Sequence, residues 1–144
     1  TLPYQATSYK KENPKETSRN EKPNWNAKTF LLVEDDPVSM EYLKEALYPT
    51  DVNILVAERG HQAMEQFNQH ASLDLILMDI KLPDFSGLEV IKEIRKIDHE
   101  VPILAQTAHA MSEDRDKCIQ AGADEYISKP IAMDGLLSTI SKLI

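Results

Sequence analysis

The sequence contains a single cysteine, Cys118, among its 144 residues. One cysteine cannot form an internal disulfide, and it cannot supply a cysteine-based metal cluster. The chain must therefore be held together by its apolar core. Because disulfides belong to oxidising compartments, this cysteine usage favours a cytoplasmic location.

Long apolar runs and an excess of basic residues are also lacking. No run approaches the ~18–20 residues that a membrane span needs, and no signal-peptide pattern opens the chain. The net charge of -8 argues against a non-specific nucleic-acid surface. With 42% hydrophobic and 28% charged residues, the composition fits one soluble globular domain. We therefore expect no direct contact with nucleic acid or membrane.

The amino-terminal part lacks large aliphatic side chains. Residues 5–27 contain no Val, Ile, Leu, Met or Phe, so they cannot bury enough apolar surface to offset the entropy of ordering. We interpret residues 1–27 as a flexible linker, with Trp25 as a candidate for docking on the domain, and residues 28–144 as the folded domain. Because the first residue is Thr1 rather than Met, we expect the chain to be a piece of a longer protein.

From Lys28 onward, short and mostly apolar runs typical of buried strands alternate with segments of helical spacing. This alternation predicts an α/β fold in which a parallel sheet has helices on both faces. Five strands in about 115 residues favour the doubly wound, flavodoxin-like (βα)5 fold with strand order 2-1-3-4-5. The strand runs are Phe30–Val33, Ile54–Ala57, Leu75–Met78, Val101–Ala105 and Glu125–Ser128, and the core sides of four helices are marked by Met40, Leu43 and Leu47, by Ala63, Met64 and Phe67, by Val90, Ile91, Ile94 and Ile97, and by Leu136, Leu137, Ile140 and Ile144.

The remaining helical segment, Ser112–Ala121, has a weaker apolar side. Ser112 is a candidate N-cap and Gly122 a candidate stop. Beyond Met111, Cys118 and Ile119 the segment offers little to a core. We therefore expect much of its surface to face water or a partner.

Polar residues gather after the strand runs, where open parallel sheets bind their ligands. In the predicted order the first and third strands are neighbours, so Asp79 is expected to face Glu34 and Asp35. We interpret Asp36 only as the cap of the helix that begins at Pro37. The residues after the runs are Glu34, Asp35 and Asp36, then Glu58, then Asp79, then Gln106 and Thr107, and finally Lys129.

This grouping predicts a phosphoryl-transfer site. Crowded carboxylates raise each other's pKa unless a cation is present, and Mg²⁺ suits a site of few carboxylates with room for water. The Thr107 hydroxyl and the Lys129 ammonium beside a metal-bound carboxylate form a cradle for a tetrahedral oxyanion. Asp79 is the candidate nucleophile, which would form an acyl phosphate. Each residue alone has an ordinary structural explanation, and their shared position favours the site.

Across residues 28–144 the sequence resembles the response-regulator receiver domain, the phosphoacceptor module of two-component signalling. The resemblance implies that Asp79 is the phosphoacceptor, that Asp35 binds Mg²⁺ directly, and that Glu34 acts through water. It also implies a backbone carbonyl ligand from Lys81. Glu34 departs from the commoner Asp. The motifs that carry the resemblance are Phe30–Pro37, Leu75–Pro83 with Gly87, Ala105–Ala110 and Ala121–Pro130.

The resemblance implies a switch as well. Thr107 is the hydroxyl that follows the phosphoryl group, Tyr126 is the aromatic residue whose ring position reports phosphorylation, and Lys129 contacts the phosphoryl oxygens. Members of the family often hold the Lys-Pro peptide bond cis, but the sequence does not decide whether Lys129–Pro130 is cis. Partners would bind the face made by the fourth helix, the fifth strand and the fifth helix. We hypothesise that Lys81 and His109 tune the lifetime of the acyl phosphate; two exposed loop side chains are the alternative.

Gln106–Met111 looks most like the receivers fused to sensor histidine kinases, and Thr1–Tyr4 resembles the last strand of a kinase ATP-binding domain. A hybrid kinase parent implies a phosphohistidine donor and a histidine phosphotransfer or output domain as acceptor. The chain would be a cytoplasmic part of a membrane-anchored protein and contains no kinase core itself.

Other classes remain open. A stand-alone response regulator is the first alternative, and an interaction module that keeps the fold without being phosphorylated is the second. A phosphatase of the haloacid-dehalogenase type also uses an Asp nucleophile after a strand, but such enzymes place a second acid where this chain has Lys81. A flavodoxin is disfavoured because acids, not a phosphate cradle, follow the first strand, and no phosphate-binding GxxxxGK loop is present.

Overall fold

The computed structural model describes residues 22–70, 72–108 and 112–144. Within them lies a parallel five-stranded sheet in the order β3-β2-β4-β5-β6. This is the 2-1-3-4-5 order, so the predicted flavodoxin-like fold is confirmed. The elements are β2 (Thr29–Val33), α3 (Pro37–Leu47), the short 3-10 helix η1 (Tyr48–Thr50), β3 (Asn53–Ala57), α4 (Gly60–Gln69), β4 (Leu75–Asp79), α5 (Gly87–Ile97), β5 (Ile103–Thr107), α6 (Ser112–Ala121), β6 (Glu125–Ser128) and α7 (Met133–Leu143).

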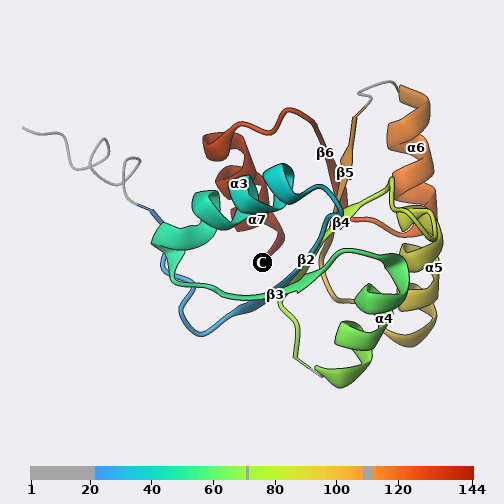
Figure 1. Ribbon diagram of the computed structural model, residues 1–144, viewed down its shortest axis with the longest axis horizontal. Helices are drawn as coiled ribbons and strands as arrows, with labels where there is room; N and C mark the ends of the chain where they lie inside the picture. The colour runs from blue at the N-terminus through green and yellow to red at the C-terminus, as the bar shows by residue number, and fades with distance from the viewer. Residues whose placement is uncertain (1–21, 71, 109–111) are drawn as a thin grey trace, which may run out of the picture.

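The sheet separates two apolar cores. Figure 1 shows α3 and α7 on one face of the sheet and α4, α5 and α6 on the other. Because successive strand side chains point to opposite faces, Phe30 and Leu32 join the core under α3 and α7, whereas Leu31 and Val33 join the other. Both faces of the central strands are thereby buried, which is why their sequences are continuous apolar runs.

The largest difference from the predicted strand boundaries is at the fourth strand, where both ends differ by two residues. The fourth strand was predicted at Val101–Ala105, but it runs from Ile103 to Thr107. Gln106 and Thr107 therefore lie inside the strand, where they pair with Asp79 and Ser128. Ladder hydrogen bonds use only backbone groups, so a polar side chain does not end a strand when the neighbouring strand continues.

Two apolar residues assigned to helix core sides are exposed. Ile97, the last residue of α5, is 62% exposed, and Ile119 of α6 is 44% exposed. Helical periodicity identifies the apolar side of a helix, but it does not show where that helix moves away from the sheet. Met111, the third residue expected on the α6 core side, lies outside the described residues, as does the side chain of the candidate cap Ser112.

Trp25 docks on the domain. Its side chain is buried, its backbone N–H donates to the Thr50 carbonyl at 2.7 Å, and its ring centroid lies 5.3 Å from that of Phe30. Packing therefore extends into the end of the segment interpreted as a linker, of which residues 1–21 lie outside the described part. None of the described helices has the length and apolar character needed to cross a membrane.

Candidate functional site

Three carboxylates meet at the carboxyl end of the sheet. Glu34 follows β2 and Asp79 ends β4, and these strands pair so that Val33 lies opposite Met78. Oxygen atoms of Glu34, Asp35 and Asp79 lie within 4.8 Å of one another. Glu34 is 1% exposed and Asp79 4%, whereas Asp35 is exposed. Parallel pairing therefore brings together the carboxylates that the sequence analysis grouped.

Lys129 reaches this cluster from the end of β6. Its Nζ lies 2.9 Å from Glu34 Oε1 and 3.3 Å from Asp79 Oδ2. Burial disfavours the charged ammonium, but the hydrogen bond to Glu34 and the attraction of both carboxylates raise the pKa of Lys129 above its usual value. The Lys129–Pro130 peptide bond, which the sequence left open, is cis.

Burial dominates the electrostatics of Glu34. It raises the pKa of this carboxyl, although hydrogen bonds from Lys129 and from the Asp36 N–H lower it. Three carboxylates against one ammonium leave the cluster with excess negative charge. A divalent cation would offset this excess, and an exposed carboxylate next to buried ones leaves a side open to water. The donor set therefore fits Mg²⁺, a hard ion that prefers oxygen ligands and keeps several waters.

The loop after β4 packs closely against Asp79. The Lys81 N–H donates to Asp79 Oδ1 at 3.1 Å, and the Gly87 N–H donates to the Ile80 carbonyl at 2.9 Å. A Cβ on Gly87 would overlap the Asp79 and Ile80 backbone, so this close approach requires glycine. The Lys81 side chain is exposed. The role of the Lys81 backbone carbonyl as a metal ligand stays a prediction. His109, which was expected to tune the acyl-phosphate lifetime together with Lys81, lies outside the described residues.

Asp84 supports the site, although the sequence analysis does not identify it. Its carboxylate accepts hydrogen bonds from the backbone N–H groups of Gly60 (2.7 Å) and His61 (3.1 Å), and it lies 2.9 Å from the His61 ring Nδ1. Although desolvation opposes the charge, these bonds lower the pKa of Asp84. It thus caps α4 from the β4–α5 loop, a contact with no local sequence signal.

The two candidate switch residues lie on the same face of the sheet. Thr107 ends β5 and is buried, and its carbonyl accepts from the Lys129 N–H at 2.8 Å. Tyr126 pairs with Ala105, two residues before Thr107, and packs against the core under α4, α5 and α6. The Arg115 guanidinium of α6 lies 5.6 Å from the Tyr126 ring centroid, which is cation–π distance. Asp36 does cap α3, as interpreted, because it accepts from the Ser39 N–H at 3.0 Å.

Known proteins with similar sequences are signalling proteins. The chain is 34% identical over 119 residues to the polar-differentiation response regulator DivK of Brucella anthropi, covering 81% of this chain and 96% of DivK. It is 35% identical to the signal transduction histidine-protein kinase BarA of Escherichia coli, covering 76% of this chain but 12% of BarA. It is 38% identical to hybrid signal transduction histidine kinase I of Dictyostelium discoideum, covering 70% of this chain but 6% of that kinase.

Solved structures of the same kind superpose well. The receiver domain of a sensor histidine kinase from Pseudomonas aeruginosa, solved with a magnesium ion coordinated in the active site cleft, matches with a TM-score of 0.74 and 33% identity, covering 81% of this chain and 96% of that one. A CheY-like receiver domain protein from Methanospirillum hungatei matches with a TM-score of 0.74 and 29% identity, covering 80% and 91%. The response regulator receiver domain pattern matches residues 30–141, and the chain therefore belongs to the response regulator receiver domain family.

Proposed function

We propose that the chain is the phosphoacceptor of a two-component phosphorelay, in which Asp79 takes a phosphoryl group from a phosphohistidine. A carboxylate oxygen of Asp79 attacks phosphorus, the phosphorus–nitrogen bond breaks, and its electron pair stays on the imidazole nitrogen. The observation that carries the proposal is the position of Asp79, which ends a buried strand 3.3 Å from Lys129 and within 4.8 Å of two other carboxylates.

Asp79, Asp35 directly, Glu34 through water and the Lys81 carbonyl are the proposed Mg²⁺ ligands. The ion would neutralise charge on the transferred phosphoryl oxygens. The magnesium ion in the Pseudomonas aeruginosa receiver supports this assignment. Lys129 now bonds two of these carboxylates, and we expect it to turn to a phosphoryl oxygen once Asp79 is modified.

Thr107 and Tyr126 are the proposed switch. The phosphoryl group adds charge and acceptor oxygens, to which the Thr107 hydroxyl can donate. Tyr126 then packs inward, which alters its contact with Arg115. The face formed by α6, β6 and α7 would change its shape for partners. The change is a shift between two populations, biased by contacts that the phosphoryl group makes in one of them.

The parent protein is proposed to be a hybrid sensor histidine kinase. BarA and the Dictyostelium kinase support this, since both exceed this chain many times in length. DivK, which the chain covers almost fully, supports a stand-alone regulator equally well. A phosphohistidine of a kinase is the donor in either case. In a hybrid parent, residues 1–27 would link the kinase to the receiver on the cytoplasmic side, and a histidine phosphotransfer or output domain would be the acceptor.

Acetyl phosphate with Mg²⁺ tests the acceptor. We expect Asp79→Asn to abolish acid-stable mass gain or radiolabelling of the protein, because it removes the proposed nucleophile. Removal of the metal with EDTA should do the same, because the charge of the transferred phosphoryl oxygens is then no longer neutralised. Asp51→Asn is the matched control. Asp51 is exposed and precedes the amino end of β3, at the opposite edge of the sheet from the site, and its positive φ of 62° suits Asn. Undiminished labelling of Asp79→Asn would place the acceptor elsewhere.

Membership of the receiver family leaves the haloacid-dehalogenase-type phosphatase without support. A direct check is turnover of p-nitrophenyl phosphate. We expect no steady-state hydrolysis beyond a slow, Asp79-dependent release, because Lys81 stands where such enzymes place their second acid.

A further inference from the structure

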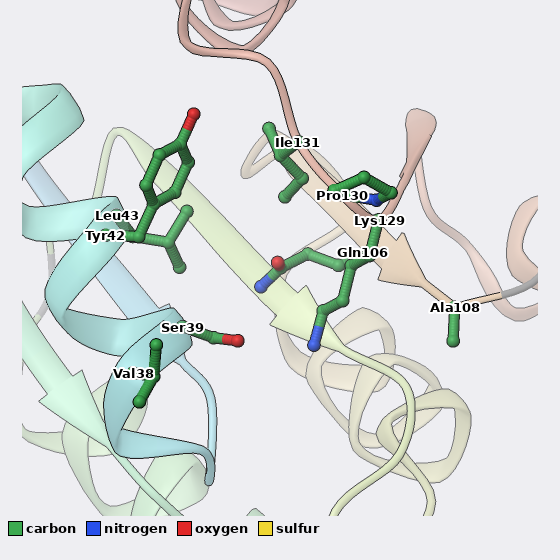
Figure 2. A pocket seen from close by; sticks show the side chains of 9 residues that line it. All are labelled: Val38, Ser39, Tyr42, Leu43, Gln106, Ala108, Lys129, Pro130 and Ile131. Carbon is green, nitrogen blue, oxygen red and sulfur yellow. The ribbon is translucent and has the colours of Figure 1, made fainter.

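A cavity of about 570 Å³ opens between α3 and the segment that connects β6 to α7 (Figure 2). This volume lies within the range of small-molecule sites, about 300–1,000 Å³. The cavity lies on the α3 and α7 side of the sheet, next to the acidic cluster, with Lys129 in the wall between them. The apolar part of the wall consists of Val38, Tyr42, Leu43, Ala108, Pro130 and Ile131.

Gln106 supplies an unusual polar group to this cavity. Its side chain points to the same face of the sheet as Leu104, two residues earlier, which belongs to the apolar core under α3 and α7. Gln106 is 1% exposed, and neither its Nε2 nor its Oε1 has a hydrogen-bond partner among the described residues. Figure 2 shows the amide directed into the cavity, toward α3.

A buried amide without partners is costly, and a ligand that bonds both of its atoms removes that cost. Two other polar side chains of the wall are already engaged, and the Tyr42 hydroxyl points away from the Gln106 amide (Figure 2). The Lys129 ammonium bonds Glu34 and Asp79, and the Ser39 hydroxyl donates to Asp36 at 2.8 Å. The Gln106 amide is therefore a buried, neutral donor–acceptor pair among mainly apolar surfaces, and the ammonium of the wall is already paired with two carboxylates.

We propose that this cavity binds a small neutral molecule that carries a carboxamide or lactam on an apolar ring. The ligand N–H donates to Gln106 Oε1 and the ligand carbonyl accepts from Nε2, so that both atoms of the buried amide gain partners. The ring packs on Leu43 and Ile131. Binding requires neither Mg²⁺ nor phosphorylation, so the proposal stands independently of the phosphoacceptor role.

Titration of the Mg²⁺-free chain with benzamide, followed by ¹H–¹⁵N NMR, tests the proposal. We expect saturable shifts of the Gln106 side-chain amide and of the backbone amides of Tyr42 and Ile131. Acetophenone has the same shape but a methyl group in place of the amide nitrogen, so it should bind about tenfold more weakly. Benzoate, which is charged, should bind more weakly still.

Gln106→Leu preserves the size of the side chain and removes its polar atoms, so the variant should fold. We expect it to bind benzamide about tenfold more weakly than the unchanged chain, and to lose the preference for benzamide over acetophenone. Gln69→Leu, at an exposed position at the end of α4 on the other face, should change neither the benzamide affinity nor that preference. Equal benzamide affinity in Gln106→Leu, shifts confined to other surfaces, or no saturable shift up to about 20 mM probe would overturn the proposal. The comparison of benzamide with acetophenone decides the question even without the variant.

Discussion

Helices α5 and α6 lie side by side on one face of the sheet, and they follow the strands that end in Asp79 and Thr107 (Figure 1). Helix α5 buries Val90, Ile91 and Ile94. Among the described side chains of α6, the buried ones are Cys118 and Ala121, both small. The two helices thus differ in how much apolar surface attaches them to the sheet.

The loop before α5 is held by several contacts. Asp84 ties the loop before α5 to α4, Ser86 caps α5 by accepting from the Leu88 N–H at 3.1 Å, and Gly87 packs on the backbone beside Asp79. Residues 109–111, which precede α6, lie outside the described part. A helix with few buried apolar contacts, such as α6, can be displaced at a low free-energy cost. The proposed phosphoacceptor therefore lies in a firmly packed part of the domain, whereas the helix over the proposed switch should require less free energy to move.

We expect the most severe loss of stability from Ile91→Ala in α5. Ile91 is fully buried, and truncating such a residue costs about 2–5 kcal/mol of unfolding free energy, because both burial and packing are lost. Urea denaturation measures the change. A loss below about 1 kcal/mol would mean that α5 is no better attached than α6, and the comparison would fail.

Arg95 of α5 connects this helix to the turn after α6. We expect Arg95→Leu to lower the free energy of unfolding by about 1–3 kcal/mol. Its guanidinium donates to the carbonyls of Gly122 and Val101, each at 2.8 Å, and these would lose their partner. The pair with Asp124 adds little because Asp124 is 44% exposed. In the variant, the backbone amides around the turn after α6 should exchange their hydrogens faster than in the unchanged chain. Full rescue by Arg95→Lys, which lacks the planar fork, would contradict this account.

Cys118→Ala should cost about 1 kcal/mol, since one buried heavy atom is removed. Together with Ile91→Ala it compares the anchors of α6 and α5 directly by urea denaturation. Burial, followed by the charge of Asp114, raises the pKa of the Cys118 thiol, so a thiol reagent should react slowly at neutral pH. A cost as large as that of Ile91→Ala would show that α6 is firmly held.

Asp84→Asn should have the smallest effect, and one that depends on pH. Because the pKa of Asp84 is lowered by folding, the folded state binds this proton less tightly than the unfolded state does. Its contribution is therefore complete above the usual carboxyl pKa of 3.8 and is lost as the pH falls below it. The gap between the unfolding free energies of the two proteins should narrow from pH 7 to pH 3. A gap of constant width would show that the α4 cap does not depend on the carboxylate charge.

The sequence alone was enough to predict the order of strands and helices and the edge of the sheet at which polar residues gather. Apolar runs and helical spacing are local patterns, and parallel strands always bring their carboxyl ends to the same edge. The sequence alone is therefore enough to group Asp79 with Glu34 and Asp35. The same patterns placed Gln106 and Thr107 after a strand that in fact includes them.

Contacts between residues that are far apart in the sequence were decided only by the tertiary structure. Lys129 bonds Glu34 across 95 positions of the chain, and Asp84 caps α4 at Gly60 across 24. The Gln106 side chain is buried with no hydrogen-bond partner in the part of the chain that the structure describes. Its strand lies between two layers of helices, and a strand carries its polar side chains inward as readily as its apolar ones. Hydrogen bonds and burial depend on which atoms meet in space, and that is set by the packing of the whole chain rather than by any short stretch of it.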